Sequence, residues 1–254
     1  MRGRLRPACA ALICGLLGLA PVVRAAHPFI TDDTNPQGVG RFELQLGSQY
    51  ARTDNEGVTL ANFQFAPQLS YGVADPVDLI IRPTYNVNVA SGGDSGRSSG
   101  WGDTNLEVKW RFWQREPRSL GLRVGTGFPS GNFARGLDSG RSTPRAYLQG
   151  GYAAAPLEVW ANVGTLRNAD DPSARTWLGH VSADVIWTVR EGLKLGLDVA
   201  ADQNPLRAST QSPTVALIGA IVTLAPWDLD VGYQRGLNRS APQNQVLLGA
   251  TLRW

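Results

Sequence analysis

The sequence predicts an all-β protein, a single antiparallel transmembrane β-barrel of about 12 strands with short periplasmic turns and longer extracellular loops. Three observations predict this fold. Apolar residues recur at every second position along residues 41–254, one face of that pattern carries no charge, and the connections alternate between short and long. Charged residues make up 18% of the 254-residue chain, so a whole face without charge indicates contact with lipid.

Residues 1–25 are predicted to be a cleaved secretory signal peptide. They begin with the cationic stretch MRGRLRP and continue with the uncharged run ACAALICGLLGLA, which is shorter than the ~20 apolar residues of a spanning helix. Val23 and Ala25 suit the −3 and −1 positions of a signal-peptidase site. The one methionine and both cysteines, Cys9 and Cys14, lie in this segment, so the exported chain is expected to contain no thiol and no disulfide.

The basic charge of the chain also lies in this segment. Arg2, Arg4, Arg6 and Arg24 account for four of the 24 basic residues, and without them 20 basic residues face 21 acidic ones. A nucleic-acid partner is therefore not expected, because such binding depends on a cationic surface.

Twelve stretches of the exported chain show the alternation of a β-strand with one apolar face. In chain order they are 42–50, 59–73, 79–89, 106–112, 120–128, 146–152, 157–165, 177–189, 193–201, 214–224, 227–233 and 246–254. In the eighth stretch, for example, Trp177, Val181 and Val185 share the apolar face, whereas Asp184 lies on the other. A soluble β-sandwich is the alternative. It predicts occasional charges on the apolar face of edge strands, because lysine protects such edges, yet both lysines of this chain fall on the polar face.

The connections between these stretches predict which end of the barrel faces which compartment. Short connections are expected at 74–77, 114–118, 154–156, 190–192 and 225–226, and long ones at 91–104, 129–143, 167–175, 202–212 and 236–244. The connection at 54–57, between the first two stretches, is the one exception: it lies at the end of the barrel where the other connections are long, but it is short. Short turns are typical of the periplasmic end of such barrels and long loops of the extracellular end.

Aromatic residues are expected to form a girdle at each end of the barrel wall. Those at the turn ends are Phe42, Tyr71, Phe112, Tyr152, Trp187, Trp227 and Trp254, and those at the loop ends are Tyr50, Phe128, Trp177 and Tyr233. The chain ends VLLGATLRW, with apolar residues alternating back from Trp254. This pattern predicts that Trp254 belongs to a signal read by the barrel assembly machinery.

Four stretches together resemble the outer-membrane transporter family named for the meta-pathway of phenol degradation. They are HPFITDDTNPQGVGRFELQLG, YGVADPVDLIIRPTY, GWGDTNLEVKWRF and GTGFPSGNFARGLDSG. The resemblance spans most of the exported chain. It implies a small barrel that passes hydrophobic or aromatic compounds.

The polar face of the strands is expected to line the lumen. Its charged candidates are Glu43, Arg82, Glu107, Lys109, Arg111, Arg123, Arg145, Glu158, Asp184, Asp198 and Asp230. The basic ones gather on the third to sixth strands, and three acidic ones lie on the eighth to eleventh. Two roles are open. Opposed walls would orient a solute, with Arg82, Arg111 and Arg123 as an anion-selective wall, or the groups would pair because buried charges need partners.

No catalytic, metal or cofactor site is expected. His180 and Ser182 are two apart on one strand, as in outer-membrane phospholipases, but their parity points them into the lumen, away from lipid. The acid pairs Asp32-Asp33 and Asp228-Asp230 lack the further oxygen ligands of a calcium site.

The polar segment 26–40 precedes the first strand of the barrel, which spans 41–254. Two arrangements are open for it, one hanging in the periplasm and one folded into the lumen as a plug.

The sequence therefore predicts a Gram-negative outer-membrane channel or transporter for passive passage of a small molecule, hydrophobic or aromatic. A closed structural or envelope-interaction barrel without transport is the alternative, and an outer-membrane lipid hydrolase is a weaker one. The expected partners are outer-membrane lipids and lipopolysaccharide, the barrel assembly machinery and the small-molecule solute.

Overall fold

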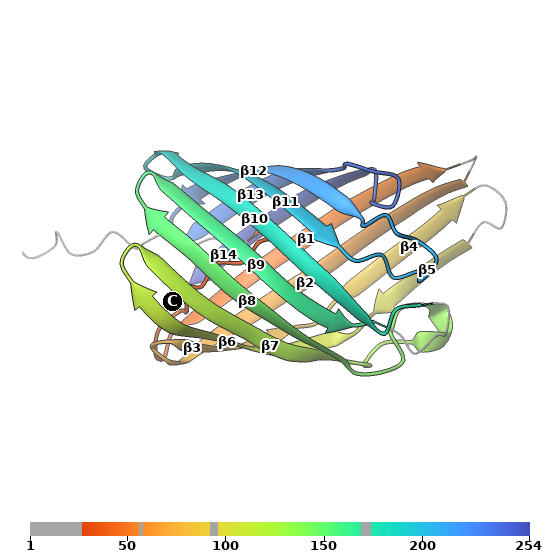
Figure 1. Ribbon diagram of the computed structural model, residues 1–254, viewed down its shortest axis with the longest axis horizontal. Coiled ribbons are helices and arrows are strands. Elements are labelled where there is room, and N and C mark those ends of the chain that lie inside the picture. The colour runs from red at the N-terminus through yellow and green to blue at the C-terminus, as the bar shows by residue number, and fades with distance from the viewer. Residues whose placement is uncertain (1–26, 56–57, 92–95, 169–173) are drawn as a thin grey trace, which may run out of the picture.

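The computed structural model describes residues 27–55, 58–91, 96–168 and 174–254, which form one closed antiparallel β-barrel (Figure 1). Closure is made by the first and last strands, β1 and β14, which pair from Glu43–Arg253 to Arg52–Asn244. The predicted signal peptide, residues 1–25, lies outside the described residues. Among the described residues, no helix is both long enough and apolar enough to cross a membrane.

The wall consists of fourteen strand segments and one short 3-10 helix. They are β1 (Phe42–Asn55), β2 (Val58–Ala74), β3 (Val77–Arg82), β4 (Tyr85–Ser91), β5 (Gly96–Trp101), β6 (Thr104–Arg115), β7 (Arg118–Phe128), η1 (Phe133–Arg135), β8 (Thr143–Ala154), β9 (Leu157–Arg167), β10 (Trp177–Arg190), β11 (Leu193–Asp202), β12 (Thr214–Leu224), β13 (Trp227–Gly236) and β14 (Asn244–Arg253). Because β3 and β4 continue one another along β2, and β5 and β6 continue one another beside them, the barrel has twelve spanning strands. The predicted fold class is confirmed.

Both interrupted strands break at the same height of the wall. Pro83 lacks the N–H that a continuous strand would donate, and it separates β3 from β4. On the neighbouring strand, Gly102 and Asp103 separate β5 from β6. The Gly102 N–H donates to the Thr84 carbonyl over 2.8 Å, and the Thr84 hydroxyl donates to the Asp103 carbonyl over 3.0 Å. These bonds hold the two breaks side by side.

The outward face of the strands is apolar, as the alternation predicts. On β10, Val181 and Val185 have exposed fractions of 53% and 44%, whereas Ser182 and Asp184 between them are buried. The same parity holds for Leu197 on β11 and for the other predicted strands. Exposed apolar side chains around a closed barrel are the surface that a bilayer covers.

Aromatic rings close the seam at the turn end. The rings of Phe42 and Trp254 stack with centroids 5.6 Å apart. On β2, the other strand that pairs with β1, the Tyr71 ring centroid lies 4.6 Å from that of Phe42. The backbone of Phe42 also exchanges two hydrogen bonds with Trp254, of 2.9 and 3.1 Å. Trp254 therefore packs directly against the first strand.

One expected long loop is shorter than predicted. Residues 91–104 were expected to be a loop, but 96–101 form β5, which pairs with β4 from Tyr85–Trp101 to Ala90–Gly96. The sequence of β5, GRSSGW, has no alternating apolar face. The strand extends the hairpin with β4 at the loop end of the wall. A period-two pattern detects only strands that have a lipid face.

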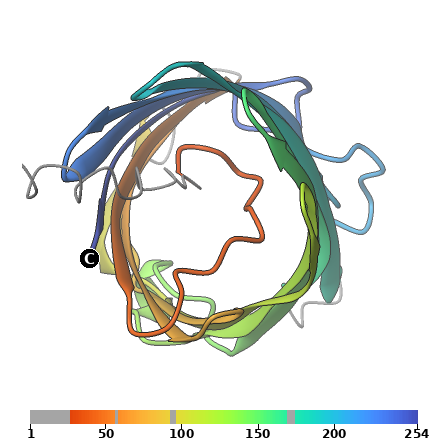
Figure 2. The same ribbon diagram turned by 90° about the vertical axis from the view of Figure 1, so that its left-hand side faces the viewer.

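Residues 27–40, called here the N-terminal segment, lie inside the barrel and cross its lumen (Figure 2). Inward-facing glycines make room for it. A Cβ atom added at Gly219 would lie 2.8 Å from Pro28 Cγ, and one added at Gly196 would overlap the Phe29 ring. At Gly47 the added atom would lie 3.0 Å from the His27 ring. The inner wall is thus shaped for the beginning of this segment.

A substitution of Gly196 by Val is expected to displace the N-terminal segment, because overpacking costs about 1–3 kcal/mol. The readout is the labelling rate of a single cysteine, Thr31→Cys, by a polar maleimide, since Thr31 is only 1% exposed. The rate should rise about 10- to 100-fold, because each 1.4 kcal/mol is a factor of about ten. Gly179→Val is the matched control, because a Cβ there meets only Gln203 at 4.0 Å. Equal labelling of all three proteins would contradict the packing described.

Candidate functional site

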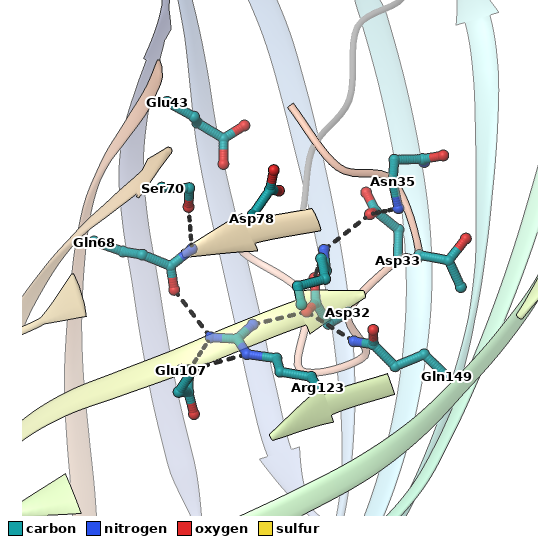
Figure 3. A network of polar contacts seen from close by, with 12 residues as sticks. Asp32, Asp33, Asn35, Glu43, Gln68, Ser70, Asp78, Glu107, Arg123 and Gln149 are labelled. Atoms are coloured by element: carbon teal, nitrogen blue, oxygen red, sulfur yellow. Dashed lines mark hydrogen bonds and ion pairs between the residues drawn. The ribbon is translucent and has the colours of Figure 1, made fainter. Parts of the chain in front are cut away.

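The centre of the lumen is a network of ion pairs around Asp32 (Figure 3). Lys109 Nζ lies 2.9 Å from Asp32 Oδ1, and the Arg123 guanidinium donates to Asp32 Oδ2 over 2.7 Å. Gln149 Nε2 donates to the same oxygen over 2.8 Å. Lys109 also reaches Asp33 Oδ1 at 3.1 Å. Three wall strands, β6, β7 and β8, therefore bind one carboxylate of the N-terminal segment.

The electrostatics of this network keep Asp32 ionised. Burial alone would raise the pKa of the Asp32 carboxyl, but Lys109 and Arg123 outweigh burial and hold that pKa well below its usual range. The carboxylate is consequently charged at any pH in which an outer membrane functions.

Arg123 uses four of its five N–H donors within this network. Its Nε donates to Glu107 Oε2 over 2.9 Å, one terminal nitrogen bonds to Asp32, and the other bonds to Glu107 and to Gln68 Oε1 at 3.2 Å. Figure 3 shows this guanidinium enclosed by the three partners. Arg123 is thus a structural cation that joins the wall to the N-terminal segment.

The backbone of the N-terminal segment is bound by other inward side chains. Asp198 on β11 accepts from the N–H groups of Ile30 and Thr31 over 2.7 and 2.8 Å, and from the Thr31 hydroxyl over 3.0 Å. Farther along, the Gln37 N–H donates to both oxygens of Asp78 on β3, at 3.0 and 3.1 Å. Acidic wall residues therefore meet backbone donors, whereas basic wall residues meet acidic side chains.

Further polar contacts continue around the wall. With its amide oriented to satisfy both groups, Asn162 on β9 accepts from the Asp32 N–H over 2.7 Å and donates to the Asp32 carbonyl over 3.0 Å. The hydroxyls of Thr34 and Ser119 lie 2.5 Å apart. At the beginning of the segment, His27 Nδ1 lies 2.5 Å from Asp230 Oδ1.

Phe29 anchors the segment in the apolar part of the lumen. Its side chain, 8% exposed, belongs to a buried cluster with five inward residues of four strands: Trp160, Ile186, Leu217, Ile221 and Leu247. Burying a phenylalanine contributes about 1.5–3 kcal/mol. The segment is therefore held by an apolar anchor at one end and by polar bonds beyond it.

Several of the predicted lumen charges pair within the wall near the turn end. Arg253 donates to Glu43 Oε2 over 2.7 Å and to Asp228 Oδ2 over 2.5 Å. Lys194 Nζ lies 2.5 Å from Glu158 Oε1. These contacts bind β14 to β1 and β13, and β11 to β9.

Of the three arginines considered for an anion-selective wall, Arg82 and Arg123 line one cavity and Arg111 lines another. Arg111 lines a turn-end cavity of about 320 Å³ together with Glu158 and Asn35. Arg82 instead lines two cavities on the loop side of the N-terminal segment, of about 280 and 160 Å³. Arg123 and Arg145 also line the smaller one. The N-terminal segment, which contributes Ile30 and Asp32 to the smaller cavity and Asn35 to the turn-end cavity, lies between Arg111 and the other arginines.

His180 and Ser182 do not form a catalytic relay. His180 Nδ1 lies 2.8 Å from Asp202 Oδ1, and the Ser182 hydroxyl has no hydrogen-bond partner among the described residues. Asp184 accepts from the Trp160 N–H over 3.2 Å. Within the part of the chain that the structure describes, no three His, Cys, Asp or Glu side chains are grouped so as to hold a metal ion.

The residues that sequence reasoning missed are Asp32, Asp33, Gln149 and Asn162. The sequence pattern of Asp32 and Asp33 indicates their role only through charge balance, because Lys109 and Arg123 inside the barrel need carboxylates to pair with. The signal available was the set of glycines at inward positions, because Gly196 and Gly219 leave space that only another chain segment fills.

Solved structures with a similar fold are outer-membrane channels and porins. An outer membrane channel from Pseudomonas putida F1 is 19% identical, with a TM-score of 0.67 over 87% of this chain and 98% of that chain. The NanC porin is 10% identical, with a TM-score of 0.52 over 83% and 98%. The KdgM porin in complex with disordered oligogalacturonate is 11% identical, with a TM-score of 0.52 over 84% and 98%. At such identities the likeness concerns the fold.

No curated protein is similar enough to this chain to count as a match. The family described as "Putative MetA-pathway of phenol degradation" matches residues 28–254, which includes the N-terminal segment as well as the wall. The chain belongs to this family, as its four sequence motifs had indicated.

Proposed function

We propose that the protein is a Gram-negative outer-membrane channel for passive passage of a small hydrophobic or aromatic molecule, and that the N-terminal segment is its plug. One observation carries the proposal: cavities of about 280 Å³ and 320 Å³ lie on the loop side and the turn side of a segment held without covalent bonds. Releasing that segment joins the two cavities into one path. The loop end then faces the cell exterior and the turn end faces the periplasm.

The loop-end mouth supports an apolar solute. A cavity of about 670 Å³ there is bounded by β1, β2, β4 and β5, and its lining includes Leu60, Ala90 and Pro242. Leu60 points inward yet is 54% exposed. An apolar mouth of this volume is large enough for a drug-sized molecule, for which sites of about 300–1,000 Å³ are usual. The family description, which concerns phenol degradation, agrees with an aromatic solute.

A closed structural barrel is the second candidate, and the density of polar bonds on residues 30–34 favours it. Each of those bonds is individually weak in net terms, however, because folding exchanges it for bonds to water. Bilayer conductance distinguishes the two candidates.

Deleting residues 27–38 from the exported chain is expected to raise the single-channel conductance severalfold, since it removes every contact of the segment with Asp198, Lys109, Arg123 and Asp78. The measurement is planar-bilayer conductance of the refolded protein, with heat-modifiable gel mobility as the test of folding.

The matched control removes residues 206–209 from the loop between β11 and β12, which lies outside the lumen, and should conduct like the unmodified protein. A folded deletion variant that conducts no better than the parent would contradict the plug. Complete silence of both folded proteins would favour the structural barrel.

Asp32→Asn is expected to increase the frequency of open events without changing the fully open conductance. Removing one partner of a buried ion pair costs about 3–5 kcal/mol. Here Lys109 and Arg123 both lose their ion pair with the Asp32 carboxylate. Single-channel recording at pH 7 measures the open frequency.

Acidification to pH 5 should not reproduce this effect. The pKa of Asp32 is lower in the folded protein than its ordinary value of 3.8, so its stabilising ion pairs are present above that value and are lost only as the pH falls below it. Asp54→Asn is the control, because Asp54 pairs with Arg52 at an exposed position. An unchanged open frequency in Asp32→Asn would show that Asp32 does not hold the segment.

A further inference from the structure

The smaller loop-side cavity is a polar pocket above the Asp32 network. It measures about 160 Å³, and Arg82, Arg145, Tyr147 and His180 face it from the wall. Ile30 and Asp32 of the N-terminal segment form its floor. The pocket therefore lies where a solute entering from the loop end would meet the segment.

This part of the lumen holds more positive than negative charge. Its cations are Arg82, Lys109, Arg123 and Arg145, and its carboxylates are Asp32, Asp33 and Glu107. One positive charge is consequently left over. The nearby Asp202 carboxylate is bound to His180 and is half exposed, so water rather than the pocket solvates it.

The excess charge resides on Arg82 and Arg145. The Arg82 guanidinium has no ion-pair or hydrogen-bond partner among the described residues. Arg145 reaches Glu107 only at 3.9 Å and donates to the Thr143 hydroxyl over 3.4 Å, and its Nε is buried without a partner in the described chain. Buried guanidinium donors without partners are costly, and a planar carboxylate satisfies them through paired hydrogen bonds.

Two further polar groups complete the pocket. The Tyr147 ring packs edge-on against the His180 ring, with centroids 5.6 Å apart, and its hydroxyl has no partner among the described residues. Because His180 Nδ1 is engaged by Asp202, its other ring nitrogen remains for a ligand. Both groups add hydrogen-bonding capacity to the pocket.

An apolar space adjoins this pocket. The neighbouring cavity of about 280 Å³ shares Arg82 and Ile30 with it, and Phe29, Ala66 and Leu247 contribute to its lining. A ligand with a charged head and an apolar body therefore has matching surroundings for both parts. A single surplus charge suits a monoanion better than a phosphate dianion.

We propose that Arg82 and Arg145 bind the carboxylate of a small apolar monoanion, such as an aromatic acid, on the loop side of the N-terminal segment. This inference rests on the proposed channel function, because the channel supplies the route to the pocket. The carboxylate bridges the two guanidinium groups, and the apolar body lies along Ile30 toward Leu247.

The test is equilibrium binding of benzoate to the folded, detergent-solubilised exported chain, measured by calorimetry at low salt. Benzamide, which has nearly the same shape without the charge, is the comparison ligand. Benzoate should bind at least about tenfold more tightly than benzamide. Arg82→Gln and Arg145→Gln should each weaken benzoate binding about tenfold or more, because each removes charge-assisted donors.

Arg82→Lys keeps the charge and loses the paired donors, so it should give an intermediate affinity. Arg52→Gln is the control, because Arg52 is exposed near the loop end and pairs only with Asp54 there. Heat-modifiable mobility establishes that each variant is folded. Equal affinity for benzoate and benzamide, or Arg82→Gln binding like the parent, would overturn the site, and so would competition by chloride at equal concentration.

Conductance of the same preparations separates this inference from the channel proposal. Conducting barrels that do not bind benzoate would overturn the carboxylate site and leave the channel. Silent barrels that bind benzoate with the expected arginine dependence would retain the site and overturn the channel.

Discussion

The ion pairs of Asp32 with Lys109 and Arg123 are the contact on which the interior of this barrel depends. An eight-stranded barrel is filled by its own side chains, but twelve strands enclose more space than opposite walls can bridge. Lys109 on β6 and Asp198 on β11 therefore cannot neutralise one another directly. The N-terminal segment resolves this by presenting carboxylates to the basic wall and backbone N–H groups to the acidic wall. The segment completes a charge pattern that the wall alone leaves open.

The two faces of the wall obey different physical rules, and this determines how far the sequence predicts them. Lipid excludes charge from the outward positions in the middle of the wall, so the alternation of Val181 with Ser182, or of Leu197 with Asp198, can be read directly from the chain. β5 has no lipid face, and its sequence GRSSGW accordingly gave no strand signal. The fold was predictable to within that hairpin extension.

The interior was predictable only in its composition. The inward parity of Lys109 and Asp198 can be read from the chain, but their partners cannot, because an ion pair such as Lys109–Asp32 joins positions 77 residues apart. No local pattern encodes such a contact. Inward glycines carry some of the missing information. Gly196 and Gly219 are small where a strand interior favours larger residues. Gly219 lies against Pro28 and Phe29, and Gly196 lies against Phe29.

The kinds of bond that hold the N-terminal segment also bear on whether it moves. Buried ion pairs fix position more than they add net stability, because desolvation offsets most of their attraction. Phe29 supplies the apolar contribution, and it lies at one end of the segment, away from Asp32. The segment is anchored at Phe29 and at its connection to β1, and these two anchors fix its position. Between them it is held by polar contacts, which other charged groups can replace. An anion that approaches Arg82 and Arg145 comes within the same electrostatic field as Asp32, so the proposed ligand and the proposed plug act on one cluster of charges.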